Sequence, residues 1–251
     1  MATVTAPASS QLRNAGTLPG RRFDHVFFTT TSVLMLATVF AGFARTYYLA
    51  GVFRAPLPSF IIHIHGAAFS CWILLLVTQT LLVSSGRTDI HRRLGIAGFL
   101  WGCFMIVIGV LAATDSLARA AGPPGRDPKT FYIVPLTDML IFATLLFFAY
   151  RKRFDSTAHK RIIYVATTGL LIAAVARLPF AFSHRNALIA GALTWIFLLI
   201  LASYDLWSTR KVHRATLWSS LFLIFVQLIR IPISKTAGWH AFATWAQHLW
   251  R

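Results

Sequence analysis

Histidines followed by cationic residues recur at the start of long apolar stretches in this sequence. The chain reads IHRRLG from Ile90, AHKRI from Ala158 and VHRAT from Val212, and each segment directly precedes such a stretch. Neutral imidazole binds haem iron, and its ordinary pKa of about 6.5 suits proton transfer. Two or more of these histidines can therefore act as ligands or proton carriers, provided that the helices they begin cluster at one site.

A structural role explains the same residues. An aspartate precedes each histidine in its segment, in the combinations Asp24 with His25, Asp89 with His91, Asp155 with His159, and Asp205 with His213. Aspartate is a preferred helix N-cap, and Asp24 and Asp89 are well placed for that role. Histidine suits a membrane interface, and its cationic neighbours can contact lipid phosphate. The sequence leaves both interpretations open.

Ionisable residues inside apolar stretches form a second candidate site. Asp138 in PLTDML and His65 in FIIHIHGAAF are flanked by apolar residues, and Arg177 and Arg230 each stand two residues before a proline. A charge in hydrocarbon costs several kcal/mol unless it has a partner or water. We therefore expect an Asp138–arginine pair, with His65 nearby, lining an outward-facing pocket. A structural lock, arginines that reach the lipid headgroups, and a hydrogen-bonded His65 within the bundle remain alternatives.

These patterns give two sets of candidate residues. His63 and His65 point about 200° apart on a helix, and His65 is favoured because Gly66 would allow close approach of a neighbour or cofactor. Cys71 and Cys103 have no metal-site spacing, so no metal site is expected. The candidate cofactor-binding residues are His65, His91 and His159, and the candidate substrate-binding residues are Asp138, Arg177 and Arg230.

Composition decides which elements position these residues. Hydrophobic residues make up 57% of the 251-residue chain and charged residues only 12%, whereas a soluble domain carries about 25% charge. Long apolar runs without alternation predict an all-α, polytopic bundle of seven transmembrane helices rather than a barrel. The expected spans are Val26–Phe43, Phe60–Val83, Leu94–Ala113, Tyr132–Tyr150, Ile162–Phe182, Leu188–Leu206 and Leu217–Ile233.

The segments outside the spans complete the expected organisation. Residues 1–22 are rich in small and polar residues and are expected to be disordered, with the first helix retained rather than cleaved as a signal. Residues 23–236 form the seven-helix membrane domain. Residues 237–251 are expected to form a short amphipathic or extended tail on the outer side.

The formal charge of +17 reflects topology rather than nucleic-acid binding. Lys and Arg concentrate in the connections on the amino-terminal side, which predicts a cytoplasmic amino terminus in the inner (plasma) membrane. These cations would contact anionic lipid headgroups. Short connections between helices offer no continuous basic face, so nucleic acid is not an expected partner.

Several motifs together resemble a known family. The segments HGAAFSCWILLLVTQTLLVSSGRTDIHRRLG, VPLTDML and AHKRIIYVATTGLLIAAVARLP resemble a family of bacterial multi-pass membrane proteins that has no assigned activity. The similarity covers roughly Ile62–Pro179. The residues on its motif positions are His65, His91, Arg92, Gly95, Asp138, His159, Arg161 and Arg177. The histidine arrangement is also distantly similar to that of b561-type cytochromes.

Three functions remain open at this stage. The first is a redox role with haem b or a quinone held either by His65 or by the histidines on the cytoplasmic side. The second is transport or lipid handling, in which Asp138, Arg177 and Arg230 bind an anionic or amphipathic molecule. The third is a non-catalytic scaffold or assembly factor, as a homo-oligomer or within a larger membrane complex. Whether the protein is an enzyme is left open.

Overall fold

A computed structural model describes residues 19–56, 58–123, 125–178 and 187–250. Every regular element in these ranges is helical, which confirms the expected all-α class. The elements are α1 (Pro19–Phe43), the π-helix η1 (Ala44–Tyr48), α2 (Ala50–Phe53), α3 (Phe60–Ser84), α4 (Thr88–Ala118), α5 (Pro128–Arg151), α6 (Ser156–Leu170), α7 (Ile172–Val175), α8 (Ala187–Thr209), α9 (Arg214–Ile233) and α10 (Ala237–Leu249).

Seven helical segments are long and apolar enough to cross a membrane, as the sequence predicts. They are Phe23–Tyr48, Phe60–Ser84, Thr88–Ala118, Pro128–Arg151, Ser156–Val175, Ile189–Thr209 and Arg214–Ile233. Together they define an integral, multi-pass membrane protein. Residues 1–18 of the segment expected to be disordered lie outside the described residues, and α1 begins at Pro19.

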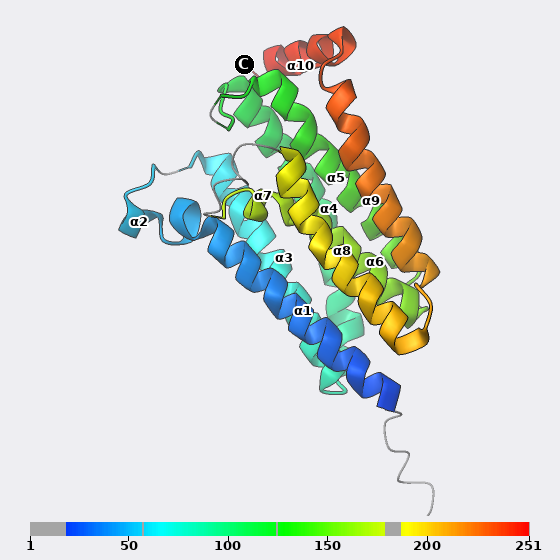
Figure 1. The fold of residues 1–251 in the computed structure, drawn as a ribbon. Helices are drawn as coiled ribbons and strands as arrows, with labels where there is room; N and C mark the ends of the chain where they lie inside the picture. Colours follow the sequence, from blue (N-terminus) through cyan, green and yellow to red (C-terminus); the bar gives the residue numbers. More distant parts are fainter. Residues whose placement is uncertain (1–18, 57, 124, 179–186, 251) are drawn as a thin grey trace, which may run out of the picture.

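The helices alternate in direction, so the bundle has two distinct ends (Figure 1). We call the end at which α1 begins the amino end and the end crossed by α10 the carboxyl end. Helices α4, α6 and α9 begin at the amino end, whereas α3, α5 and α8 begin at the carboxyl end. Residues near the starts of α4 and α6 therefore lie far from residues near the start of α3.

Two spans are interrupted where they meet near the carboxyl end. Helix α1 passes into η1 and then α2, and α6 breaks at Leu171 before α7. A Cβ atom at Gly42 would lie only 2.3 Å from the carbonyl oxygen of Ala174, so α1 and α7 are in backbone contact. Interrupted backbone is tolerated at membrane depth where protein buries it.

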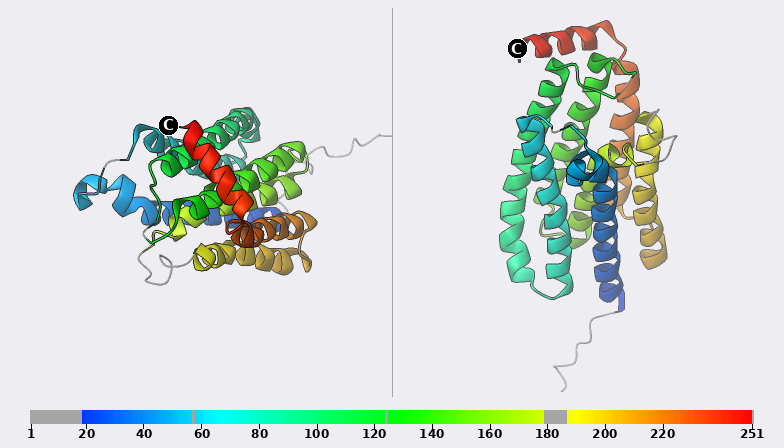
Figure 2. Two further views of the ribbon diagram at one scale, coloured as in Figure 1. Left: turned by 90° about the horizontal axis from the view of Figure 1, so that it is seen from above. Right: turned by 90° about the vertical axis from the view of Figure 1, so that its left-hand side faces the viewer.

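Helix α10 lies across the carboxyl end of the bundle (Figure 2). The Oγ1 atom of Thr236 accepts a hydrogen bond from Trp239 N (3.2 Å) and caps the helix. Trp239 Nε1 donates to the Lys129 carbonyl (2.8 Å), and Gln247 Nε2 donates to the Leu117 carbonyl (3.1 Å). The segment expected to be an amphipathic or extended tail thus contains a docked helix.

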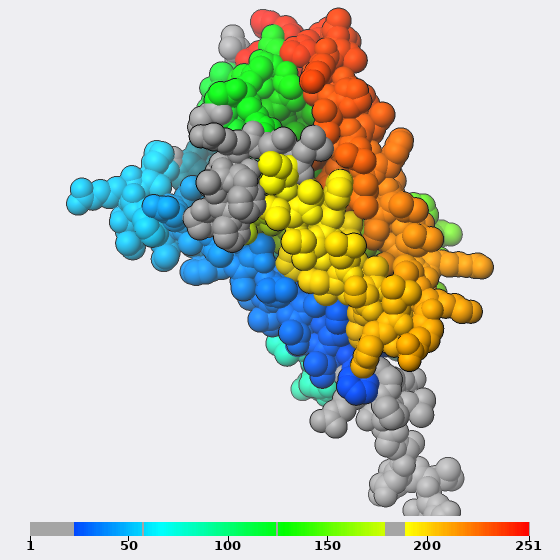
Figure 3. Space-filling view, in the orientation of Figure 1, coloured from blue at the N-terminus to red at the C-terminus, as the bar shows by residue number. Residues whose placement is uncertain are grey.

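The surface of the bundle is apolar over much of its length, as a lipid-facing surface requires. Helices α1, α8 and α9 form the face seen in Figure 3. Large side chains that α8 exposes include Ile196, Leu199, Leu206 and Trp207. Cys71 and Cys103 also lie exposed on this surface, and neither forms a disulfide.

Candidate functional site

A pocket of about 260 Å³ opens between α5, α8 and α9 near the carboxyl end. Its apolar walls include Phe131, Ile133, Val134 and Ile231. Its polar lining includes Trp195, Gln227, Arg230, Ser234 and Lys235, together with Arg126 and Asp127 from the segment before α5. An apolar cavity with a few converging polar groups is the usual form of a small-molecule site.

Arg230 provides a buried cation in this pocket. Its Nη1 atom donates to Asp138 Oδ1 (2.7 Å) and to Thr137 Oγ1 (3.2 Å), and only 4% of its side-chain surface is exposed. The expected Asp138–arginine pair is therefore present, with Arg230 as the arginine. Both bonds use one nitrogen, so Nε and Nη2 have no protein partner among the described residues.

Gln227 lies one helical turn before Arg230 and also lines the pocket. Its Oε1 atom accepts a hydrogen bond from Trp195 Nε1 (2.7 Å), which fixes the orientation of the amide. Its Nε2 atom is buried and has no hydrogen-bond partner among the residues that the structure describes. A buried donor left unsatisfied costs about 1–3 kcal/mol, and a bound acceptor would remove that cost.

Charged residues surround the outer part of the pocket. Asp127 caps α5 by accepting hydrogen bonds from Thr130 N (2.7 Å) and Thr130 Oγ1 (2.6 Å). These bonds hold the pKa of the Asp127 carboxyl below its ordinary value. Arg126 and the exposed Lys235 line the same region, so cations outnumber carboxylates in the pocket lining.

Arg177 and His65 do not join this site, contrary to expectation. The Nη1 atom of Arg177 donates to the Ala173 carbonyl (2.7 Å), and its guanidinium lies over the Phe43 ring at 4.7 Å. The His65 ring packs on Phe69 with centroids 4.2 Å apart, and its buried Nδ1 has no hydrogen-bond partner within the described ranges. Neither Arg177 nor His65 lines the pocket.

The three histidines proposed as cofactor ligands do not converge. His65 lies near the start of α3, and about 28 Å of helix separates it from the end of α3 at Ser84. His91 and His159 lie near the starts of α4 and α6, which are at the opposite end of the bundle. His91 and His159 are close enough to interact electrostatically. His65 is therefore a candidate separate from His91 and His159, and a role of either as a cofactor ligand stays a prediction.

The environment of His91 also argues against a bis-histidine haem. His159 Nδ1 donates a hydrogen bond to the Ala149 carbonyl (2.9 Å), which is a usual arrangement for a ligating imidazole. Gln79 is best oriented with its amide nitrogen donating to His91 Nδ1 (2.7 Å) and its oxygen accepting from Gly95 N (3.0 Å). The proton of neutral His91 is then on Nε2, which leaves no free lone pair for iron. His91 and His159 therefore do not fit a bis-histidine haem.

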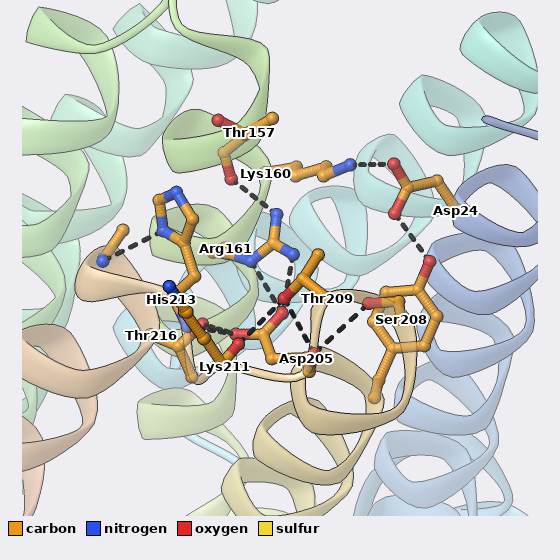
Figure 4. A network of polar contacts seen from close by, with 12 residues as sticks. Asp24, Thr157, Lys160, Arg161, Asp205, Ser208, Thr209, Lys211, His213 and Thr216 are labelled. Carbon is orange, nitrogen blue, oxygen red and sulfur yellow. Dashed lines mark hydrogen bonds and ion pairs between the residues drawn. The ribbon is translucent and has the colours of Figure 1, made fainter. Parts of the chain in front are cut away.

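A buried ion pair at the amino end was missed by the sequence interpretation (Figure 4). Arg161 of α6 donates to Asp205 Oδ1 of α8 through Nε (2.9 Å) and Nη2 (2.6 Å). Asp205 Oδ2 accepts from His213 N (3.0 Å) and Thr216 Oγ1 (2.6 Å). Asp205 is fully buried and its hydrogen bonds join α6, α8 and the start of α9, so this network is structural.

Several helix caps differ from those expected from the sequence. Asp24 lies inside α1 rather than at its N-cap, and it accepts hydrogen bonds from Lys160 Nζ (2.5 Å) and Tyr204 Oη (2.6 Å). Asp89 lies in the first turn of α4, after the N-cap Arg87. The imidazole of His213 caps α9, since its Nδ1 accepts from Ala215 N (3.1 Å). Burial and the nearby Arg161 cation lower the pKa of His213.

The fold and the pocket together define an integral, multi-pass membrane protein with a partly cationic pocket between its spans. The chain matches no protein-family model, no curated protein and no solved structure in the comparisons. The resemblance over Ile62–Pro179 therefore stays a prediction.

Proposed function

We propose that the protein binds a small amphipathic anion in the pocket between α5, α8 and α9, in a transport or lipid-handling role. The observation that carries this proposal is the pairing of Arg230 through one nitrogen only, beside the unpartnered donor of Gln227. Both residues line the same cavity. Buried donors of this kind favour a ligand that accepts hydrogen bonds and carries negative charge.

The chemistry of the lining favours a carboxylate or phosphate on an apolar body. Guanidinium presents a planar set of donors that matches two oxygens of either group. The apolar walls would hold a short hydrocarbon portion, and Trp195 offers a flat surface beside it. The volume of about 260 Å³ lies below the roughly 300–1,000 Å³ of sites for drug-sized ligands, which favours a small molecule or a lipid headgroup.

Two sources supply this chemistry, namely a free carboxylate or phosphate and an anionic lipid headgroup. Calorimetric titration of the purified protein in an uncharged detergent, with octanoate and with inorganic phosphate, tests the free ligands. The lipid headgroup is tested by reconstituting the protein in phosphatidylglycerol or in phosphatidylcholine and measuring the lipid it retains by mass spectrometry. Saturable binding of any anionic probe supports the proposal, and binding of none of them overturns it.

Variants then assign the binding to the pocket. Replacing Arg230 alone would leave Asp138 buried and unpaired, so the test uses Asp138→Asn combined with Arg230→Gln. Hydrogen bonds to charged groups contribute about 1.5–3 kcal/mol, so anion binding should weaken by about 10- to 100-fold. Arg177→Gln is the matched control, since Arg177 has the same spacing to a following proline but lies outside the pocket. Equal affinity of the double variant and the unaltered protein would refute the assignment.

We also propose that the protein lies in the inner (plasma) membrane with its amino end facing the cytoplasm, because the cations concentrate in the connections at that end. A cysteine replacing Lys152, between α5 and α6, should then be protected from a membrane-impermeant maleimide added outside. A cysteine replacing Lys235, between α9 and α10, should be labelled. Cys71 and Cys103 are replaced by alanine in both variants, and the reverse labelling pattern would contradict this orientation.

A further inference from the structure

The buried Asp138–Arg230 ion pair affects the charge balance of the pocket when an anion binds. Before binding, Asp138 and Arg230 carry opposite charges at 2.7 Å and form a neutral pair. An anion that bonds Nε and Nη2 of Arg230 would place two carboxylates around one guanidinium. A net negative charge would then lie inside the membrane-spanning part of the protein, where uncompensated charge is costly.

One proton removes this excess charge. Two carboxylates that share a site do not both ionise readily, and the one in the less hydrated position takes the proton. Asp138 keeps only 11% of its side-chain surface exposed, whereas the bound anion would lie nearer the pocket opening. The Oδ1 atom of Asp138 faces Arg230, and Oδ2 has no protein partner in the part of the chain that the structure describes, so Oδ2 is free to accept the proton.

The other charged groups near the site do not provide the same compensation. Among the described residues, Arg230 of α9 is the charged group that interacts with Asp138. Arg126, Asp127 and Lys235 line the outer part of the pocket, and His240 of α10 interacts with Asp127 rather than with Asp138. Lys235 is exposed, so water screens its charge.

Resting on the proposed function, we propose that the protein binds its anionic ligand together with one proton, which Asp138 accepts. The step forms one O–H bond at Asp138 Oδ2 with a proton from the solvent and breaks no covalent bond. The site changes from an aspartate–arginine pair to a neutral aspartic acid beside an arginine–anion pair, and its net charge remains zero. The ligand class is therefore an anion that is taken up with a proton.

The test is the proton uptake that accompanies octanoate binding, measured in weakly buffered solution between about pH 6 and about pH 8, where octanoate is ionised. The unaltered protein should take up one proton for each octanoate bound. Its affinity should accordingly fall about tenfold for each unit of pH increase. In Asp138→Asn, the amide oxygen can still accept the hydrogen bond from Arg230. This variant should bind octanoate without proton uptake, and its affinity should not change with pH.

The outcomes separate this inference from the proposed function. Octanoate binding without proton uptake by the unaltered protein would overturn the inference and leave the proposed function intact. Failure of the unaltered protein to bind octanoate, phosphate or phosphatidylglycerol would overturn the proposed function itself. If Asp138→Asn binds octanoate and still takes up a proton, the acceptor is a different residue and the assignment to Asp138 is wrong. The measurement on the unaltered protein decides the coupling even where the variant does not fold.

Discussion

Removal of the Asp205 carboxylate should strongly destabilise the bundle. Asp205 is fully buried and accepts four hydrogen bonds, two of them from Arg161, whose side chain is 4% exposed. In Asp205→Ala the Arg161 cation would be buried without its partner, and the backbone N–H of His213 would lose its acceptor. Breaking a buried pair from one side costs about 3–5 kcal/mol, and we expect a loss of that size in the free energy of unfolding.

The assay is reversible unfolding by SDS in mixed micelles, monitored by far-UV circular dichroism. The matched control is Asp115→Ala, which breaks an ion pair with Arg119, a side chain that is 44% exposed. We expect the control to cost no more than about 1 kcal/mol. Replacing both Arg161 and Asp205 by leucine should cost less than Asp205→Ala alone, because no buried charge remains unpaired. Equal stabilities of the Asp205 and Asp115 variants would refute the reasoning.

Three further predictions concern individual contacts. Burial lowers the pKa of His213, so the unfolded chain binds more protons, and the contribution of His213 to stability falls as the pH decreases below about 7. His213→Asn should keep the cap of α9 and lose this pH dependence. An unchanged pH profile of unfolding in the variant would contradict this prediction. Gly42→Ala should destabilise the contact of α1 with α7 by about 1–3 kcal/mol in the same SDS assay, whereas Gly238→Ala, with no atom within 4 Å of the added Cβ, should not share that steric penalty. Thr236→Ala should remove the cap of α10 at a cost of about 1 kcal/mol, and amide hydrogen exchange in α10 should become faster while exchange in α5 stays unchanged.

The sequence predicted the spans well because hydropathy over about 20 residues depends little on packing. It also predicted a partner for Asp138, because a buried carboxylate flanked by apolar residues needs compensation. It did not decide which arginine is that partner. Arg177 and Arg230 share their spacing to a following proline, and only the placement of α7 against α1 separates Arg177 from the pocket.

The network around Asp205 was missed because Arg161 and Asp205 stand at the ends of the expected spans Ile162–Phe182 and Leu188–Leu206. Asp205 was considered only with His213 and Arg161 only as a motif position, whereas both side chains are buried in the structure. The position of Asp205 after the apolar run LILASY was a usable signal, since it requires a partner in the same way as Asp138. His65 and His91 were alternative candidates, and they lie far apart because α3 and α4 begin at opposite ends of the bundle.

The most direct test of the pocket is a structure of the protein bound to octanoate that carries bromine at its far end. We predict an anomalous bromine peak between α5, α8 and α9, with the carboxylate within hydrogen-bond distance of Arg230 and Gln227. The competing position is the apolar groove between α1 and α8 that is lined by Phe27, Tyr204 and Trp207. A bromine peak in that groove, with the carboxylate away from Arg230, would contradict the proposed site.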